Sequence, residues 1–545
     1  MSGPFNLADY YLFDRLDEGL AEAPALLFGE RRQSYAEVAA DVRALSAYLI
    51  AAGVAAEQRV LLALPDTPAY AAAFFATLRI GAVVAMGNPH APTGDLDYLV
   101  RYTGARAVVT TVDVAGALAP TLAECGCLVI QVEDVATGED WRARRADASP
   151  AVWLADALEG GRRLEERGAP TRRETEADHP AIWLFTSGST GRSKAAMHCH
   201  RDFAFNTERY AISTVGYRHG DITVSVPRLF FGYATGTNLM FPFRVGATAA
   251  LFSERPTPET LARAIERYRP TIVTNVPTMM GKLLEDDDAR TARKEPRLDL
   301  SSVRFHLSAG EALPPALLAR FLERFGGEVY DGIGSAEMFH IYCSNRPGDV
   351  MPGSLGRVVD GYELRILAAD AEGPGAPTLP AGETGVMWVK GDSVALGYYG
   401  DRDKSWETFH GHWCRTGDLF RIDERGYLWF EGRADDLLKV GGIWVAPLEV
   451  ENCLAEHPVV AAVAVIGVEL EGLVKPKAFV VPKSQEEATE SLADALKHWV
   501  QTRLSKHKYP RLVAFVDELP KNDRGKIDRK ELRRRELAGQ NPVGR

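Results

Sequence analysis

The sequence predicts an α/β protein: a large N-terminal domain of layered sheets and helices that includes a β subdomain, followed by a small α+β domain. Apolar runs of strand length alternate with helix patterns through the first part of the 545 residues. The pattern then changes at Gly353 and again at Gly432. Because a chain of this length exceeds one ordinary core, we expect domains over residues 1–432 and 433–545.

The first helix is expected over residues 34–53, with Ser34 as its N-cap and Gly53 as its end. Apolar side chains recur along one face at helical spacing, at Val38, Val42, Leu45 and Leu49. The run 59–64 is largely apolar and stops at Pro65, so we expect a short buried strand there.

Strand, loop and helix patterns repeat from Thr271 and from Phe305, and another strand pattern begins at Glu328. Such alternation favours a largely parallel sheet, in which ligands bind at the carboxyl ends of the strands. The charge-rich stretch 133–178 shows no sustained period, so it is expected to be a surface excursion.

The last third of the chain is predicted to hold two kinds of structure. Short alternating segments between Gly353 and Glu431, separated by Gly and Asp turns, indicate an antiparallel β subdomain. Beyond Gly432 we expect a separate α+β set of about the size of one domain. Its elements are a helix near 447–456, strands near 459–466 and 477–481, and a helix near 492–504.

Charge and cysteine content limit the partners and the location of the protein. The formal net charge is -11, which argues against general binding to nucleic acid or anionic membranes. The six cysteines show no disulfide framework, and the longest apolar run, 69–78, is too short to span a bilayer. The N-terminus lacks the pattern of a targeting signal. We therefore expect a cytoplasmic protein without nucleic-acid or membrane partners.

The stretch "LFTSGSTGRSK", residues 184–194, follows a short apolar strand, and we expect it to lead into a helix. Its glycines allow backbone N–H groups to converge on an oxyanion such as phosphate. Hydroxyl and basic side chains add donors, at Thr186, Ser187, Ser189, Thr190, Arg192 and Lys194. The spacing excludes a Walker A loop and the G-x-G-x-x-G fingerprint. A polar surface loop rich in small residues is the alternative.

Several motifs, which occur in the same order along the chain, resemble those of the adenylate-forming superfamily of acyl-CoA synthetases, adenylation domains and luciferases. "TSGSTGRSK" is similar to the phosphate loop of that family, with Ser193 and Ala195 at positions where Pro and Gly are usual. The resemblance implies that this loop binds the β and γ phosphates of ATP. The residues concerned are Thr186, Ser187, Gly188, Ser189, Thr190, Gly191 and Lys194.

"YDGIGSAE", residues 330–337, resembles the segment that lines adenine and ends in a glutamate serving Mg²⁺. The resemblance implies a catalytic and metal-binding role for Glu337, and one carboxylate suits a cation that also binds phosphates. Ala336 stands where the family has Thr, with Ser335 as a substitute hydroxyl. Further nucleotide contacts are implied for Gly310, Glu311, Asp331, Gly332 and Ile333.

Three motifs nearer the C-terminus complete the resemblance. "WCRTGDL" places Asp418 where the family holds the ribose hydroxyls. "GRADDLLKVGG" resembles the hinge before a mobile C-terminal domain, and "PKNDRGKIDR" resembles the loop with the adenylation lysine, Lys526. The hinge motif implies a catalytic Arg433 facing ribose or phosphate, a pivot at Asp435, and Gly441 and Gly442 on the side of coenzyme A. Taken alone, Asp418 reads as a turn residue and the surroundings of Lys526 as a solvated basic surface.

Within the superfamily, "LFFGYATGTN", "SAGEALP" and "DGIGSAEMFHIY" resemble the benzoate-CoA ligases. The resemblance implies a pocket for a small aromatic carboxylic acid. Its walls would be Gly232, Tyr233, Ser308, Ala309, Ile333 and His340. Gly232 stands where Ala is expected, which leaves room for a ring substituent. Benzoate, 2-aminobenzoate (anthranilate) and hydroxybenzoate therefore all stay open.

The implied enzyme is an AMP-forming acid–thiol ligase. It would join the acid to the AMP of ATP, with Mg²⁺ and charged side chains stabilising the phosphates, and then pass the acyl group to coenzyme A. Two alternatives stay open: a stand-alone adenylation protein that loads a carrier protein, and a non-catalytic binder of acyl-adenylates. A homodimer is compatible with the sequence, which does not decide the oligomeric state.

Overall fold

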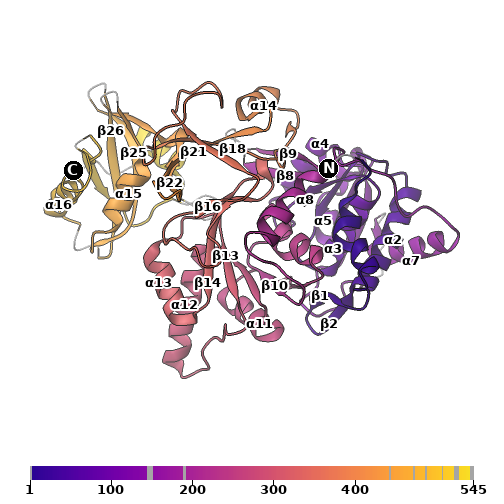
Figure 1. Cartoon of the computed structure of the whole chain (residues 1–545). Coiled ribbons are helices and arrows are strands. Elements are labelled where there is room, and N and C mark those ends of the chain that lie inside the picture. Colours follow the sequence, from indigo (N-terminus) through magenta and orange to yellow (C-terminus); the bar gives the residue numbers. More distant parts are fainter. Residues whose placement is uncertain are drawn as a thin grey trace. The chain divides into compact units, whose positions relative to one another are not determined.

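The chain folds into two units, which are described one at a time. The computed structural model describes residues 3–143, 151–187, 192–440, 443–470, 473–484, 488–505, 507–520 and 527–539. The first unit comprises Met1–Leu364 and Val389–Arg415, and the second comprises Arg365–Trp388 and Thr416–Arg545. Figure 1 follows the chain through both units by colour. The domain boundary expected between residues 432 and 433 stays a prediction.

Two mixed sheets form the framework of the first unit. In the described part of the chain, one sheet has eight strands in the order β19-β9-β8-β4-β3-β5-β6-β7. Six of these strands, β8, β4, β3, β5, β6 and β7, run parallel to one another. At one edge of the sheet, β9 pairs antiparallel with β8, and β19 pairs antiparallel with β9. Their bounds are β3 (Arg59–Ala63), β4 (Val83–Met86), β5 (Ala107–Thr111), β6 (Leu128–Val132), β7 (Val152–Trp153), β8 (Pro180–Ser187), β9 (Ser193–Cys199) and β19 (Gly397–Tyr398).

The other sheet of the first unit has nine strands in the order β16-β15-β14-β13-β12-β10-β11-β1-β2, again among the described residues. They are β1 (Pro24–Phe28), β2 (Arg31–Ser34), β10 (Ile222–Ser225), β11 (Thr248–Leu251), β12 (Ile272–Asn275), β13 (Phe305–Ser308), β14 (Glu328–Gly334), β15 (Ile341–Ser344) and β16 (Arg357–Val358). The parallel register pairs Asn275 with Ser308, and Ser308 with Asp331. The carboxyl ends of three strands therefore lie side by side, and the predicted parallel arrangement is confirmed.

Helices follow the strands of the first unit as the sequence predicted. Helix α2 (Tyr35–Ala51) begins at Ser34, whose side chain accepts from the Glu37 N–H, while the Glu37 carboxylate accepts from the Ser34 N–H. Helices α11 (Pro258–Tyr268), α12 (Pro277–Arg293) and α13 (Pro315–Phe325) share one apolar core with β10, β12 and β14. Figure 1 shows α12 and α13 beside the strands β13 and β14. The further helices used below are α8 (His200–Asn206) and α9 (Gly232–Thr235).

The stretch 133–178 is not only the surface excursion that the sequence predicted. It contains helix α7 (Leu154–Glu166), which packs against α2. The buried residues of α7 recur at helical spacing, at Leu154, Ala157, Leu158 and Gly161. Gly161 lies so close to α2 that a Cβ atom would stand 1.8 Å from the Ala44 carbonyl oxygen. The prediction failed because the high charge of the exposed face hid this narrow apolar stripe.

The expectation that residues 184–194 lead from a strand into a helix is wrong. Strand β8 continues to Ser187, and the chain returns as the antiparallel strand β9 from Ser193. Residues 193–199 pair with β8, and Ala196 and Met197 pair also with β19, so extended backbone satisfies their hydrogen bonds. The helix begins only at His200.

Strands of a five-stranded sheet occupy the region predicted to be a β subdomain. Among the described residues its order is β17-β18-β21-β20, with β22 paired to β21. The bounds are β17 (Glu363–Leu367), β18 (Gly385–Lys390), β20 (Phe409–His410), β21 (Trp413–Ile422) and β22 (Leu428–Arg433). The pairs β20–β21 and β21–β22 are antiparallel, as expected. A helix that was not predicted, α14 (Arg402–Thr408), interrupts the region.

The C-terminal part of the second unit has the α+β content that the sequence predicted. Strands β25 (Val460–Leu470), β26 (Leu473–Pro482) and β27 (Leu512–Phe515) form a sheet. Helices α15 (Pro447–Ala455) and α16 (Glu490–Gln501) share an apolar core with it, and α17 (Arg529–Leu537) contacts β25. Two short strands, β23 (Leu438–Val440) and β24 (Ile443–Val445), precede α15. Each helix in the described part of the chain is too short or too polar to span a lipid bilayer.

Candidate active site

The ends of β8 and β9 present the predicted phosphate loop. Thr186 lies opposite Lys194 in the antiparallel register, so the basic side chain and the hydroxyl flank the same loop. Lys194 Nζ lies 3.6 Å from the centroid of the Tyr398 ring. Burial lowers the pKa of Lys194, and the nearby Glu337 carboxylate opposes this shift. The predicted loop residues Gly188, Ser189, Thr190 and Gly191 lie outside the described residues, as does the side chain of Ser187.

Glu337 is held in place by contacts of its backbone and of its carboxylate. It belongs to the short turn Ala336–Met338. The Tyr398 hydroxyl donates to Glu337 Oε1 over 2.7 Å, and the Ala395 N–H donates to the Glu337 carbonyl over 2.9 Å. His198 Nε2 contacts the adjacent Ala336 carbonyl at 2.7 Å. Lys194 and Glu337, which are far apart in the sequence, therefore meet at Tyr398.

The surroundings of Glu337 suit a magnesium ion, which stays a prediction. Tyr398 occupies one carboxylate oxygen, and the other makes no hydrogen bond with the described residues. Within the same residues, no group of three or more His, Cys, Asp or Glu side chains is arranged to hold a metal. Mg²⁺ often takes only one or two protein carboxylates and completes its shell with water and substrate phosphates. A lone Glu337 is compatible with that mode of binding.

The strand β14 brings the predicted adenine segment to the carboxyl end of the sheet. Asp331 is 6% exposed, and burial raises the pKa of its carboxyl to about 7. Its Oδ1 atom has no hydrogen-bond partner among the described residues. At Gly332 a Cβ atom would stand 2.8 Å from the Cys343 carbonyl oxygen, so glycine is required. Asp331 thus offers a buried acceptor atom, and its predicted contact with adenine stays a prediction.

The remaining predicted nucleotide contacts lie on the loop after β13 and on β14. Gly310 has φ +84°, a conformation that favours glycine. The Glu311 carboxylate accepts from the Thr278 N–H over 3.0 Å and from its hydroxyl over 2.7 Å. Glu311 therefore supplies an acceptor to a backbone N–H group in the first turn of α12, where such groups have no partner within the helix. Ile333 on β14 pairs antiparallel with Cys343 on β15.

Gly232, Tyr233 and His340 meet beside the phosphate-loop strand. His340 Nε2 contacts the Tyr233 carbonyl at 3.0 Å, and the two rings are 5.3 Å apart. Burial lowers the pKa of His340 to about 4, so the imidazole is neutral at neutral pH. A Cβ atom at Gly232 would stand 3.3 Å from Leu184 Cδ1. The other predicted pocket residues, Ser308 and Ala309, are buried at the end of β13.

In the second unit, the hairpin β21–β22 joins two predicted site residues. Asp418 and Arg433 are directly opposite in register, and Arg433 Nη1 donates to Asp418 Oδ1 over 2.7 Å. Asp435 lies in the following short turn, Ala434–Asp436. The predicted residues Gly441, Gly442 and Lys526 lie outside the described residues.

Comparison with known families identifies the chain. The model of the AMP-binding enzyme family matches residues 13–399, and the model of the AMP-binding enzyme C-terminal domain matches residues 449–526. The chain belongs to the AMP-binding enzyme family. Its assignment from sequence motifs to the adenylate-forming superfamily is confirmed.

Individual members of the AMP-binding family match along almost the whole chain. A benzoate–CoA ligase from Thauera aromatica is 38% identical over 531 residues, which cover 97% of this chain and 96% of that protein. An anthranilate CoA ligase, solved in complex with anthranoyl-AMP, has a TM-score of 0.83 and 33% identity over 98% of both chains. A benzoate CoA ligase from Burkholderia xenovorans LB400 has a TM-score of 0.80 and 35% identity over 97% of this chain and 100% of the other. The predicted fold class and enzyme class, an AMP-forming acid–thiol ligase, are confirmed.

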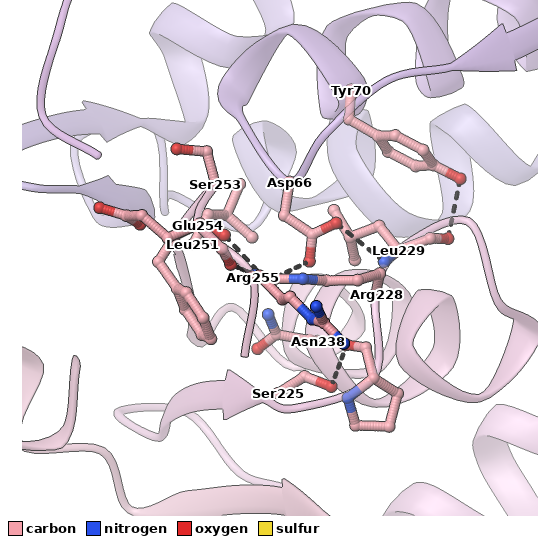
Figure 2. A network of polar contacts seen from close by, with 12 residues as sticks. Asp66, Tyr70, Ser225, Arg228, Leu229, Asn238, Leu251, Ser253, Glu254 and Arg255 are labelled. Carbon is pink, nitrogen blue, oxygen red and sulfur yellow. Dashed lines mark hydrogen bonds and ion pairs between the residues drawn. The ribbon is translucent and has the colours of Figure 1, made fainter. Parts of the chain in front are cut away.

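In this AMP-binding enzyme a buried ion pair, which the sequence analysis missed, anchors the segment before Gly232 (Figure 2). Arg228 Nη1 lies 3.3 Å from Asp66 Oδ2, and the Leu229 N–H donates to Asp66 Oδ1 over 3.0 Å. The Tyr70 hydroxyl donates to the Leu229 carbonyl over 2.8 Å. Loss of one member of a buried ion pair typically costs about 3–5 kcal/mol. The network therefore fixes the chain just before Gly232, and an arginine inside the apolar run "VPRLFF" was its only signal.

Proposed function

We propose that this protein is an ATP-dependent ligase that activates a small aromatic carboxylic acid as its acyl-adenylate and transfers the acyl group to coenzyme A. The observation that carries the proposal is that Lys194 and Glu337, the side chains expected to serve the phosphates and the cation, meet at Tyr398. The benzoate and anthranilate ligases named above support the class of acid and the use of ATP and coenzyme A.

In the first half-reaction, an oxygen of the aromatic carboxylate attacks the α phosphorus of ATP. The bond from the α phosphorus to the bridging oxygen breaks, and pyrophosphate leaves. A magnesium ion bound by Glu337 would supply positive charge to the phosphates. Lys194 and Lys526 would stabilise the charge that develops on them, Asp331 would accept from the adenine amino group, and Asp418 with Arg433 would hold the ribose.

In the second half-reaction, the thiol of coenzyme A attacks the acyl carbon of the adenylate and AMP leaves. We assign this step to the side of Gly441 and Gly442, after the C-terminal domain has turned about Asp435 and withdrawn Lys526. These roles rest on the resemblance of the motifs. A homodimer, a cytoplasmic location and the lack of nucleic-acid and membrane partners likewise stay predictions.

The acid is proposed to carry one aromatic ring. Tyr233 and neutral His340 offer flat walls with few charges, which suits a ring better than an extended acyl chain. Gly232 stands where the resemblance leads us to expect Ala, so 2-aminobenzoate and hydroxybenzoates are candidates beside benzoate.

A screen of pyrophosphate release tests the proposal. The purified protein receives MgATP with benzoate, the aminobenzoates, the hydroxybenzoates or a medium-chain fatty acid. We expect release with at least one aromatic acid and little with the fatty acid. Release that does not depend on any acid, or that favours the fatty acid, would contradict the proposed function. Thioester formation with coenzyme A, compared with a carrier protein, then identifies the acceptor.

A further inference from the structure

Tyr398 lies between the two charged side chains that the proposed function assigns to ATP and its cation. Its hydroxyl donates to Glu337 Oε1 over 2.7 Å, while Lys194 Nζ lies 3.6 Å from the centroid of its ring. The residue is 5% exposed, so this arrangement is shielded from bulk water. One phenol thus contacts a carboxylate through its hydroxyl and an ammonium group through its ring.

The backbone fixes this position independently of the side chains. Strand β19 pairs antiparallel with β9, and the register sets Tyr398 opposite Ala196. Lys194 lies two residues before Ala196 on β9, so its side chain projects from the same face of the sheet as Tyr398. The Tyr399 N–H donates to the Ala195 carbonyl over 3.0 Å, which holds the two strands together at this point.

The charges around Tyr398 explain why a tyrosine is useful there. Burial, and then the Glu337 carboxylate, raise the pKa of the Tyr398 phenol, which therefore keeps its proton and remains a donor. Among the described residues Lys194 contacts the ring of Tyr398 and Glu337 accepts from its hydroxyl, and no ion pair joins Lys194 to Glu337. A direct ion pair would partly neutralise two groups that the proposed mechanism needs separately, one for phosphate and one for the cation.

We propose that Tyr398 is a positioning residue for MgATP: its hydroxyl orients Glu337 toward the cation, and its ring keeps Lys194 apart from Glu337. This inference rests on the proposed function, because it assumes that Glu337 and Lys194 serve the cation and the phosphates. It assigns Tyr398 no contact with the substrate.

Calorimetric titration of Tyr398→Phe tests the role of the hydroxyl. The variant keeps the ring and loses the hydroxyl that donates to Glu337. We expect the affinity for MgATP to fall by about tenfold, as for loss of a hydrogen bond to a charged group, whereas the affinity for ATP in EDTA stays within about twofold. An unchanged affinity for MgATP would overturn the role of the hydroxyl. So would equal losses with and without the cation, which indicate a merely structural effect.

Two further variants test the separation of charges by the ring. In Tyr398→Leu, Lys194 is free to pair with Glu337, so ATP should bind more weakly even in EDTA. The double variant Tyr398→Leu/Glu337→Gln removes the competing carboxylate and should recover much of that loss. If the double variant binds ATP in EDTA no better than Tyr398→Leu, the separating role of the ring is wrong. The Tyr398→Phe test does not depend on whether the leucine variants fold.

Tyr399→Phe is the matched control. Its ring packs on Trp183 with centroids 4.4 Å apart, and its hydroxyl makes no hydrogen bond with the described residues. It should bind MgATP and ATP like the wild type. The titrations contain no aromatic acid, so an error in the proposed acid appears only in the pyrophosphate screen. Wild-type protein that does not bind MgATP would overturn both the proposed function and the role of Tyr398.

Discussion

Gly232 is the residue at which the structure bears most directly on the choice of acid. A Cβ atom there would stand 3.3 Å from Leu184 Cδ1 and 3.5 Å from the Phe339 carbonyl oxygen. The space is therefore just closed by one methyl group, and Leu184 would have to shift slightly. In the proposed function, glycine at this position lets the enzyme accept an acid with a substituted ring.

We predict that Gly232→Ala shifts the preference from 2-aminobenzoate toward benzoate. The ratio of their kcat/KM values should change by about tenfold, since one methyl group in an apolar pocket is worth about 1–3 kcal/mol. Steady-state pyrophosphate release with each acid measures the ratio. Gly281→Ala is a control on α12, where a Cβ atom would meet Leu317 only at 3.9 Å. Equal losses with both acids would place Gly232 away from the ring substituent.

Asp331 should make the stability of the nucleotide-free protein depend on pH. Burial raises the pKa of its carboxyl to about 7 from an ordinary value of 3.8. Between these two values the folded protein binds a proton that the unfolded chain has released, so stability falls as pH rises. Each unit of pKa corresponds to about 1.4 kcal/mol, which makes the expected loss a few kcal/mol by neutral pH.

We predict that Asp331→Asn reduces this loss, because an amide cannot ionise. Thermal unfolding midpoints of both proteins, measured without nucleotide from about pH 5 to about pH 8, test the prediction. The wild-type midpoint should fall more steeply than that of the variant. Parallel curves would show that the carboxyl of Asp331 does not titrate in this range.

At the scale of elements, the helices α7 and α2 pack very closely at one glycine. Gly161 abuts the backbone of Ala44, whereas the neighbouring Gly160 has room, with Tyr48 at 3.6 Å from a Cβ atom. Both glycines lie within α7. Because their surroundings differ, we expect the same substitution to alanine to change the stability in opposite directions at these two adjacent positions. The difference lies in the packing of α7 on α2.

We predict that Gly161→Ala destabilises the first unit by about 1–3 kcal/mol or more, because the new methyl group meets backbone that cannot rotate away. Gly160→Ala should instead be neutral or stabilise by up to about 1 kcal/mol, since alanine favours a helix over glycine. Denaturant unfolding of the three proteins measures both effects. A Gly161→Ala protein as stable as the wild type would contradict the close packing of α7 on α2.

At the scale of the whole molecule, the proposed function requires one chain to catalyse two reactions in turn. The phosphate-loop strands and Glu337 belong to the first unit, and the predicted adenylation lysine belongs to the C-terminal part of the second. A lysine that serves only the first reaction should be dispensable in the other. The two half-reactions can be measured separately, which makes this division testable.

We predict that Lys526→Ala lowers the rate of acyl-adenylate formation by about a hundredfold or more, the cost typical of losing a group that stabilises developing charge. Thioester formation from supplied aryl-adenylate and coenzyme A should stay within about twofold of the wild type. Lys521→Ala, in the same basic stretch, is the control and should affect neither step. Similar losses in both half-reactions would contradict the role assigned to Lys526.

Most of the local structure and the class of this protein could be predicted from short-range patterns of residues. The cap at Ser34 and the apolar spacing in α2 depend on residues only a few positions apart. The strand–helix alternation depends on neighbouring elements, so these elements could be predicted. The motifs around Lys194, Glu337 and Asp418 also indicated the family, which the comparisons confirmed.

Which of these residues meet depends on the tertiary structure. After the loop within residues 184–194 the chain continues as the strand β9 and not as the expected helix, because pairing with β8, and at two residues with β19, satisfies that backbone. The fold brings Asp66 and Arg228 together as an ion pair, and it places Tyr398 between Lys194 and Glu337. Each of these contacts joins segments that are distant in sequence. These contacts form only when the strands pair and the sheet is buried, so a local pattern of residues cannot predict them.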